Sequence, residues 1–141
     1  MRLFLCFILL LASCRPHFPL KLTASPYAFE ALERVIAEVN AAAGEEWLTL
    51  GGEIFISDVH RTDLACGEWF EYTGEIYIYC PAFREIIIMH ELGHVMGLQH
   101  VNDRESIMYP TLLYRTIPDA AKKLVDEVRQ HYKMTAQKDY Q

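Results

Sequence analysis

Residues 90–100 read His-Glu-Leu-Gly-His-Val-Met-Gly-Leu-Gln-His. His90 and His94 are four positions apart, so a helix with 3.6 residues per turn places both imidazoles on one face. Gly97 stands where this helix is expected to end, because glycine adopts the left-handed conformation at little steric cost. The turn that follows allows His100 to approach the other two histidines from outside the helix. Three imidazoles with one position left for water are typical of a catalytic zinc ion, whereas a structural zinc ion has four protein ligands.

Glu91 stands beside the first histidine of this motif, where it can reach a water molecule on the metal. The metal lowers the pKa of that water, and Glu91 is predicted to take its proton as a general base and to deliver it to the leaving amine. The alternative is a buried helix whose histidines are ordinary core residues. Three histidines on one apolar helix would then need other partners for their ring nitrogens, which favours the metal site.

The motif resembles the extended zinc-binding motif of the metzincin metallopeptidases, and a second element of that family follows it. Residues 106–110, Ser-Ile-Met-Tyr-Pro, are similar to the Met-turn, whose methionine (here Met108) forms an apolar floor below the metal. Read alone, Met108 would be an ordinary core methionine. The Met-Tyr-Pro ending is closer to the matrixin branch than to the astacin-like branch. In the latter a tyrosine two residues after the methionine contacts the metal, and Pro110 stands at that position here, so Tyr109 is not an expected ligand.

Residues 25–59 are predicted to contain a helix and two strands. Ser25 is the expected N-cap of the helix, Pro26 its first residue and Gly44 its end. Residues 47–50 and 53–59 have the apolar pattern of strands. The core side of the helix is predicted from its apolar positions at helical spacing, which are Phe29, Leu32, Ile36, Val39 and Ala43.

The zinc-binding helix is expected to begin near Pro81 or Ala82, and its apolar residues 86–89 indicate burial. A last helix is predicted after the cap residue Thr116. Together with the resemblance, this order implies an α/β fold of the zincin-like α+β type. It would have a small twisted mixed sheet with an edge hairpin, the zinc-binding active-site helix, the Met-turn and a C-terminal helix. The expected core face of the last helix comprises Ala121, Leu124, Val125, Val128 and Tyr132.

The first residues indicate export. Arg2 precedes an apolar run at 3–12 that is too short to span a bilayer comfortably, which is typical of a signal peptide. Residues 11–14, Leu-Ala-Ser-Cys, resemble the lipobox of bacterial lipoproteins, in which cleavage precedes the cysteine and the cysteine, here Cys14, is lipidated. The alternative is an ordinary secretory signal in which Cys14 is incidental. We expect a lipid-anchored protein of a bacterial cell membrane, in the periplasm or at the cell surface, or otherwise a secreted protein.

The expected domain organisation follows from these assignments. Residues 1–13 form a lipoprotein-type signal peptide, 14–24 a tether or first extended segment, 25–132 a metzincin-like catalytic domain and 133–141 a tail. Removal of the signal leaves 141 − 13 = 128 residues, which is enough for one hydrophobic core.

The charge of the chain restricts its partners. The net charge is −6, and removal of Arg2 with the signal makes it −7. An acidic domain without a basic stripe is not expected to bind nucleic acid. Attraction to anionic lipid is also disfavoured, so membrane attachment would depend on the N-terminal lipid alone. The expected partner is a peptide or protein substrate, and we expect a monomer.

Cys66 and Cys80 are the cysteines that remain after the signal and the anchor, and export to an oxidising compartment predicts that they pair. The sequence between them predicts a hairpin with strands at 69–71 and 75–79 around a three-residue loop, 72–74. In that register the two cysteines lie opposite each other, and closing a loop of this size contributes about 3 kcal/mol. The alternative, reactive or metal-binding cysteines, is not favoured because neither belongs to a Cys-x-x-Cys pair.

The resemblance also implies where substrate binds. In the family, a hairpin strand just before the zinc helix forms the upper rim of the cleft and pairs with substrate as an added antiparallel strand. Residues after the Met-turn line the pocket for the side chain that follows the cut, which suggests an apolar pocket here, although these residues fit an ordinary core equally well. The matching positions are Glu68, Trp69, Phe70, Glu71 and Tyr72 for the rim, and Thr111, Leu112, Leu113 and Tyr114 for the pocket.

The expected activity is zinc-dependent hydrolysis of internal peptide bonds, with one catalytic zinc ion. A second zinc ion is not expected, because His60 and Asp63 have no further histidines near them in the sequence. The alternative function is a lipid-anchored binding or adhesion protein that keeps zinc structurally and has no turnover. The intact Glu91 disfavours that alternative.

Overall fold

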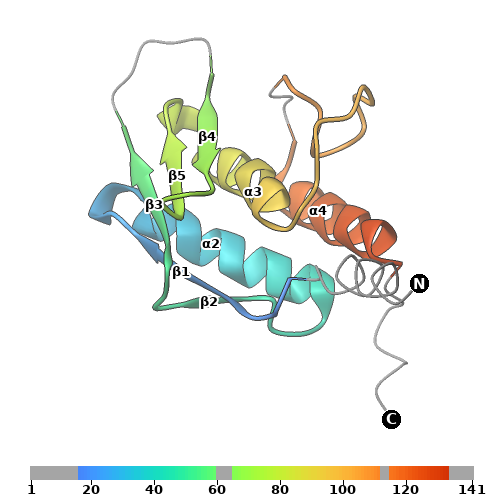
Figure 1. Ribbon diagram of the computed structural model, residues 1–141, viewed down its shortest axis with the longest axis horizontal. Helices are drawn as coiled ribbons and strands as arrows, with labels where there is room; N and C mark the ends of the chain where they lie inside the picture. Colours follow the sequence, from blue (N-terminus) through green and yellow to red (C-terminus); the bar gives the residue numbers. More distant parts are fainter. Residues whose placement is uncertain (1–15, 60–64, 112–114, 134–141) are drawn as a thin grey trace, which may run out of the picture.

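The computed structural model describes residues 16–59, 65–111 and 115–133 as one mixed sheet with helices packed on it (Figure 1). Helices α2 and α3 pack on the sheet, and α4 packs against both of them. This is the α/β zincin-like architecture that the sequence predicted. In chain order the elements are β1 (Leu20–Ala24), α2 (Pro26–Ala43), β2 (Leu48–Leu50), β3 (Ile54–Asp58), β4 (Gly67–Phe70), β5 (Glu75–Ile78), the 3-10 helix η1 (Pro81–Phe83), α3 (Arg84–Val95) and α4 (Ile117–His131).

The sheet has five strands in the order β2-β1-β3-β5-β4. All neighbouring strands are parallel except β4 and β5, so β4 is an antiparallel edge strand. Leu22, Ile56 and Ile76 lie on the face covered by the helices and are fully buried. Side chains alternate along a strand, so Phe55 and Tyr77 lie on the other face, where Phe55 is 38% exposed.

Strand β1 changes the N-terminal boundary of the folded domain. The sequence predicts a tether or a first extended segment at residues 14–24, and Leu20–Ala24 is an interior strand of the sheet, between β2 and β3. Before it, the ring of Phe18 stacks on Trp47 with 4.3 Å between centroids. The domain therefore begins before the predicted boundary at Ser25. Nothing local marks this strand, because its pairing partners follow it by more than twenty residues.

Helix α2 has the predicted ends but a different buried face. Pro26 is its first residue, and Gly44 ends it with a φ of 72°. Phe29, predicted in the core, is 40% exposed. The buried face is centred instead on small and branched residues that allow close packing of the sheet and of α4. These residues are Ala28, Ala31, Leu32, Val35, Val39 and Ala43.

The hairpin differs from the prediction by one residue in register. A three-residue loop would have paired Phe70 with Ile76, whereas the structure pairs Trp69 with Ile76 and leaves a four-residue loop. The N–H groups of Thr73 and Gly74 both donate to the carbonyl oxygen of Phe70, at 3.2 and 2.9 Å, which closes the turn one residue earlier. Because side chains alternate along a strand, this shift brings Trp69 rather than Phe70 to the side of α3.

The structure contains the predicted disulfide between Cys66 and Cys80. With the shifted register it joins a diagonal pair, since the carbonyl oxygen of Cys66 accepts from the N–H of Tyr79 at 2.8 Å and from that of Cys80 at 3.3 Å. The bond links the start of the edge strand β4 to the chain entering η1 and α3. It therefore connects β4, which forms one wall of the cleft described below, to α3, the helix that carries two of the three histidines.

The predicted signal at 1–13 and the predicted lipidated Cys14 lie outside the described residues, as does the tail from residue 134. Among the helices within the described ranges, none has both the length and the apolar character needed to cross a bilayer.

Replacing both cysteines of the disulfide by serine (C66S with C80S) is expected to lower the free energy of unfolding by about 3 kcal/mol, because the bond closes a loop of about 15 residues in the unfolded chain. Urea unfolding followed by tryptophan fluorescence measures this difference. Adding a reductant should destabilise the parent protein by a similar amount and leave the double variant unchanged. Equal stability of parent and double variant would contradict the expectation.

Candidate active site

Helix α3 places two histidines on one face and then ends in a sharp turn. His90 and His94 lie within the helix, and the N–H of Met96 still donates to Leu92. Gly97 then has a φ of 90°, a conformation that favours glycine. A Cβ at this position would also lie 2.6 Å from the hydroxyl oxygen of Tyr132. Gly97 is therefore required twice, by the turn and by the close packing of the last helix, and the turn directs the chain back toward His100.

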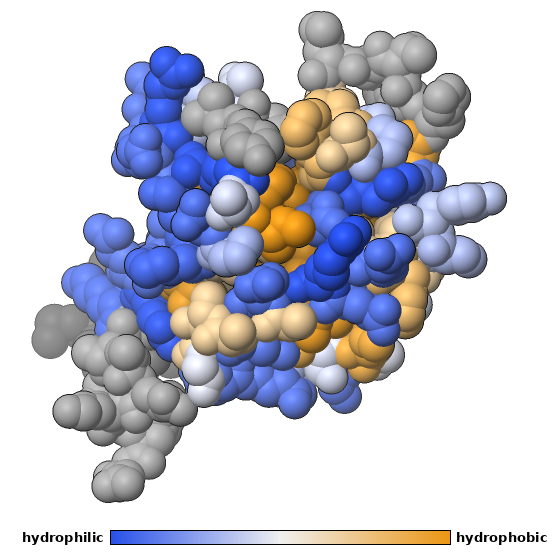
Figure 2. All heavy atoms as spheres, turned by 180° about the vertical axis from the view of Figure 1, so that it is seen from behind, coloured by the Kyte–Doolittle hydropathy of each residue, from blue (hydrophilic) through white to orange (hydrophobic). Residues whose placement is uncertain are grey.

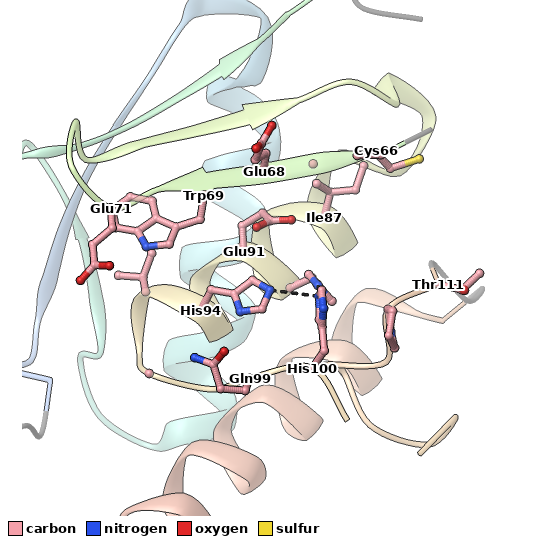
Figure 3. Close-up of a pocket in the computed structure, with 16 residues that line it drawn as sticks. Cys66, Glu68, Trp69, Glu71, Ile87, Glu91, His94, Gln99, His100 and Thr111 are labelled. Atoms are coloured by element: carbon pink, nitrogen blue, oxygen red, sulfur yellow. Dashed lines mark hydrogen bonds between the residues drawn. The ribbon is translucent and has the colours of Figure 1, made fainter. Parts of the chain in front are cut away.

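The three histidines converge through their Nε2 atoms. His100 Nε2 lies 3.1 Å from His90 Nε2 and 3.2 Å from His94 Nε2. Figure 3 shows the imidazoles of His94 and His100 directed at one another across the opening of the pocket. The potential ligand atoms of the three histidines all lie within 4.8 Å of one another, so these side chains could hold one metal ion.

The opposite ring nitrogens show that this set fits a metal ion. His90 Nδ1 lies 2.8 Å from the carbonyl oxygen of Ile107, and His94 Nδ1 lies 2.9 Å from that of Leu98. A carbonyl oxygen only accepts, so Nδ1 carries the proton in both rings and the Nε2 lone pairs face the common point. Burial lowers the pKa of His90 to about 4 and also lowers the pKa of His94, which keeps both rings neutral near pH 7. Neutral imidazoles directed at one point suit a divalent cation.

Glu91 is buried beside these histidines, with 5% of its surface exposed. Figure 3 shows it between the strand that carries Trp69 and the imidazoles of His94 and His100. Burial raises the pKa of its carboxyl group to about 7, the negative charge of Glu68 adds to this rise, and a backbone hydrogen bond from Trp69 opposes it. A carboxyl group with a pKa near neutrality can both accept and release a proton under ordinary conditions.

Glu91 approaches β4 closely because residue 67 is glycine. A Cβ on Gly67 would lie 2.9 Å from Glu91 Oε1 and 2.3 Å from Ile87 Cγ2. Any other residue would force β4 or the side chains of Ile87 and Glu91 to move. The absence of a side chain at Gly67 therefore sets the distance between the carboxylate and the wall of the cleft.

Met108 lies under the histidine-bearing helix, where the sequence predicted the floor of the Met-turn. Its side chain is 1% exposed. A Cβ on Gly93 would lie 2.3 Å from the Met108 sulfur, so the thioether occupies the space left by that glycine, one residue before His94. The structure thus places Met108 directly against the backbone that carries the second predicted ligand.

A cleft of about 870 Å³ opens over Glu91 and the three histidines. Of the residues predicted to contact substrate, Glu68, Trp69, Glu71 and Thr111 line it. Phe70 does not, because its ring lies on the other face of the sheet, 5.0 Å from the ring of Tyr77. Tyr72 also lies away from the cleft, fully exposed in the hairpin loop. Leu112, Leu113 and Tyr114 lie outside the described residues.

The cleft also contains residues that the sequence did not single out. Ile87 and Val95 line it from α3, and Gln99 lines it from the turn after the helix. Ile87 and Val95 stand four positions before and after Glu91, so helical spacing from the predicted base would have identified them. Gly67 also had a local signal, since a glycine in a strand often marks a close approach of another backbone or a ligand.

The mixed sheet with its helices and the three converging histidines define a zincin-like fold with a candidate metal site. The matrixin family model matches residues 59–132, just over half of the sequence, and the chain belongs to the matrixin family. It is also similar to the macrophage metalloelastase of Rattus norvegicus, with 55% identity over 29 residues. That match covers 21% of this chain and 6% of the relative, so the chain spans only a small part of that protein's length.

The substitution Gly67→Ala is expected to destabilise the protein by about 1–3 kcal/mol, because the added methyl group overlaps Ile87 and Glu91 and the edge strand must move. Thermal unfolding of the metal-free protein measures this change without reference to activity. A variant with the parent's unfolding temperature would show that β4 does not rest against Glu91 as described.

Proposed function

We propose that this protein is a zinc-dependent endopeptidase that hydrolyses peptide bonds with Glu91 as the general base. The observation that carries the proposal is the convergence of three imidazole Nε2 atoms beside a buried carboxyl group at the floor of an open cleft. Three nitrogen ligands leave a coordination position for reacting groups, whereas a fourth protein ligand would close it.

His90, His94 and His100 would hold one zinc ion. Such an ion supplies a Lewis acid that polarises a carbonyl group and makes water reactive near neutral pH. Glu91 would accept the proton of the attacking water and return it to the amine that leaves. Its raised pKa supports this exchange, because a carboxyl group with a pKa near 7 is neither a permanent acid nor a permanent base at that pH.

The proposed substrate is a peptide or protein chain bound along β4. This strand is at the edge of the sheet and pairs with β5 on one side, so its other side suits a substrate strand. Glu68, Trp69 and Glu71 lie along this wall of the cleft, and Thr111 lines it after the Met-turn. We propose that Thr111 contributes to the pocket for the side chain after the cut.

We also propose that the protein acts outside the cytoplasm as a monomer, held at a bacterial cell membrane by lipid on Cys14 or else secreted. The disulfide between Cys66 and Cys80 supports an oxidising compartment. The face in Figure 2 is mainly hydrophilic, with hydrophobic residues in a narrow band and small patches, which suits a monomer. The net charge of −6 disfavours nucleic acid as a partner.

The substitution Glu91→Gln is expected to leave zinc content unchanged and to lower cleavage of a mixed peptide library by about 10²- to 10⁴-fold, which is the usual contribution of general acid–base catalysis. The matched control is Glu85→Gln on the same helix, where the carboxylate pairs with Arg34. The control should cleave at the parent rate. Cleavage at the parent rate by Glu91→Gln would reject Glu91 as the base.

Removal of zinc by a chelator is expected to abolish cleavage, and one equivalent of zinc should restore it. The substitution His100→Ala should remove tight zinc binding, while His131→Ala, which changes another exposed histidine, should retain it. Metal analysis after dialysis measures the zinc content of both variants. Full zinc content without any chelator-sensitive cleavage would favour the alternative, a zinc-containing binding or adhesion protein.

A further inference from the structure

We propose that Glu127, on α4, is a positioning residue for the predicted zinc ligand His90. It would act through a hydrogen-bond chain that passes through Ser106 and the peptide group between Ile107 and Met108. The inference rests on the zinc centre of the proposed function, but its evidence is separate from the cleft and from Glu91.

The Glu127 carboxylate holds the Met-turn at two points. Its Oε2 accepts from the hydroxyl of Ser106 at 2.7 Å, and its Oε1 accepts from the N–H of Ile107 at 2.9 Å. Ser106 is 6% exposed, so the contact with its hydroxyl is shielded from water. A carboxylate that accepts from two donors makes stronger bonds than a neutral acceptor would.

The chain continues from Ser106 to His90 without a break. Ser106 Oγ accepts from the N–H of Met108 at 2.9 Å, and that N–H belongs to the peptide group that joins Ile107 to Met108. The carbonyl oxygen of the same peptide group, on Ile107, accepts from His90 Nδ1–H at 2.8 Å. The donors run in one direction, from imidazole to peptide, from peptide to hydroxyl and from hydroxyl to carboxylate.

This direction matters for the zinc ligand. Hydrogen bonds that follow one another in a chain polarise each other, so the negative charge of Glu127 strengthens the acceptor that His90 faces. A stronger acceptor at Nδ1 fixes the ring orientation and makes Nε2 a better metal ligand, as in sites where a carboxylate contacts the histidine directly. Here a hydroxyl and one peptide group would transmit the effect. His94 is oriented locally instead, by Leu98 in the turn after its own helix.

The test compares Glu127→Gln with Asp126→Asn on the same helix. The first substitution keeps the size of the side chain but removes its charge and weakens the acceptor for the Ser106 hydroxyl. The second changes an exposed carboxylate that pairs with Lys122. Competition with a chromophoric chelator measures zinc affinity. We expect Glu127→Gln to weaken zinc binding by about 10-fold or more and Asp126→Asn to leave it unchanged.

A second variant and a metal-free measurement separate this effect from a general loss of stability. Ser106→Ala removes the hydroxyl link but keeps the bond from Ile107 to Glu127, and it should also weaken zinc binding. In the metal-free protein, the ¹⁵N shifts of the His90 ring should change in Glu127→Gln and in Ser106→Ala but not in Asp126→Asn. These shifts do not depend on zinc, so they decide the inference even if the parent protein were to bind no zinc and the proposed function were to fail.

The structural alternative gives a different result. If Glu127 only anchors the loop, Glu127→Gln lowers the unfolding temperature equally with and without zinc. At a fixed zinc concentration, the zinc-induced increase is set by the affinity, which would then be unchanged. An unchanged increase, together with parent-like ¹⁵N shifts of His90, would overturn the proposal. A reduced increase with shifted His90 signals would support it.

Discussion

Two imidazoles on one face of a helix can meet at a common point. Here the third imidazole comes from the segment that leaves the helix and turns back toward it. In this protein the return depends on Gly97, whose φ of 90° ends α3 and whose missing side chain leaves room for Tyr132. The three Nε2 atoms meet only because the chain reverses there. The remaining structure holds the two ends of this reversal in place, α3 on one side and the Met-turn on the other.

Helix α4 and its C-cap residue Tyr132 provide most of that support. The hydroxyl of Tyr132 donates to the carbonyl oxygen of Met96 at 2.9 Å, where α3 ends, and Glu127 holds the Met-turn. Arg129 donates to the carbonyl oxygen of Ala43 at 2.6 Å, at the end of α2, and its guanidinium lies 5.5 Å from the centre of the Trp47 ring. One helix therefore contacts the C-terminal ends of the two other helices and the loop below the histidines. Its polar residues bind backbone groups that would otherwise lack partners.

The sequence predicted the parts of this protein whose causes are local. His90, His94 and Gly97 are separated by distances that a single helix and its end explain, and the caps at Ser25 and Gly44 are local as well. Other features depend on residues far apart in the chain. The pairing of Leu20–Ala24 with β3, the one-residue shift of the hairpin, and the exposure of Phe29 follow from packing between elements. The contact of Glu127 with Ser106 spans 21 positions and has no local pattern.

The candidate metal site depends on both local and nonlocal features. Residues 90–100 contain the three predicted ligands, yet the acceptor for His90 Nδ1 is Ile107, and Ile107 is held by a carboxylate of the last helix. A chain in which α4 has not docked would contain the motif without this support. Zinc would then bind the completed domain more tightly than partly folded chains, and by mass action it would stabilise the domain as a whole. The local motif would supply the ligands, and the nonlocal fold would determine how well they bind.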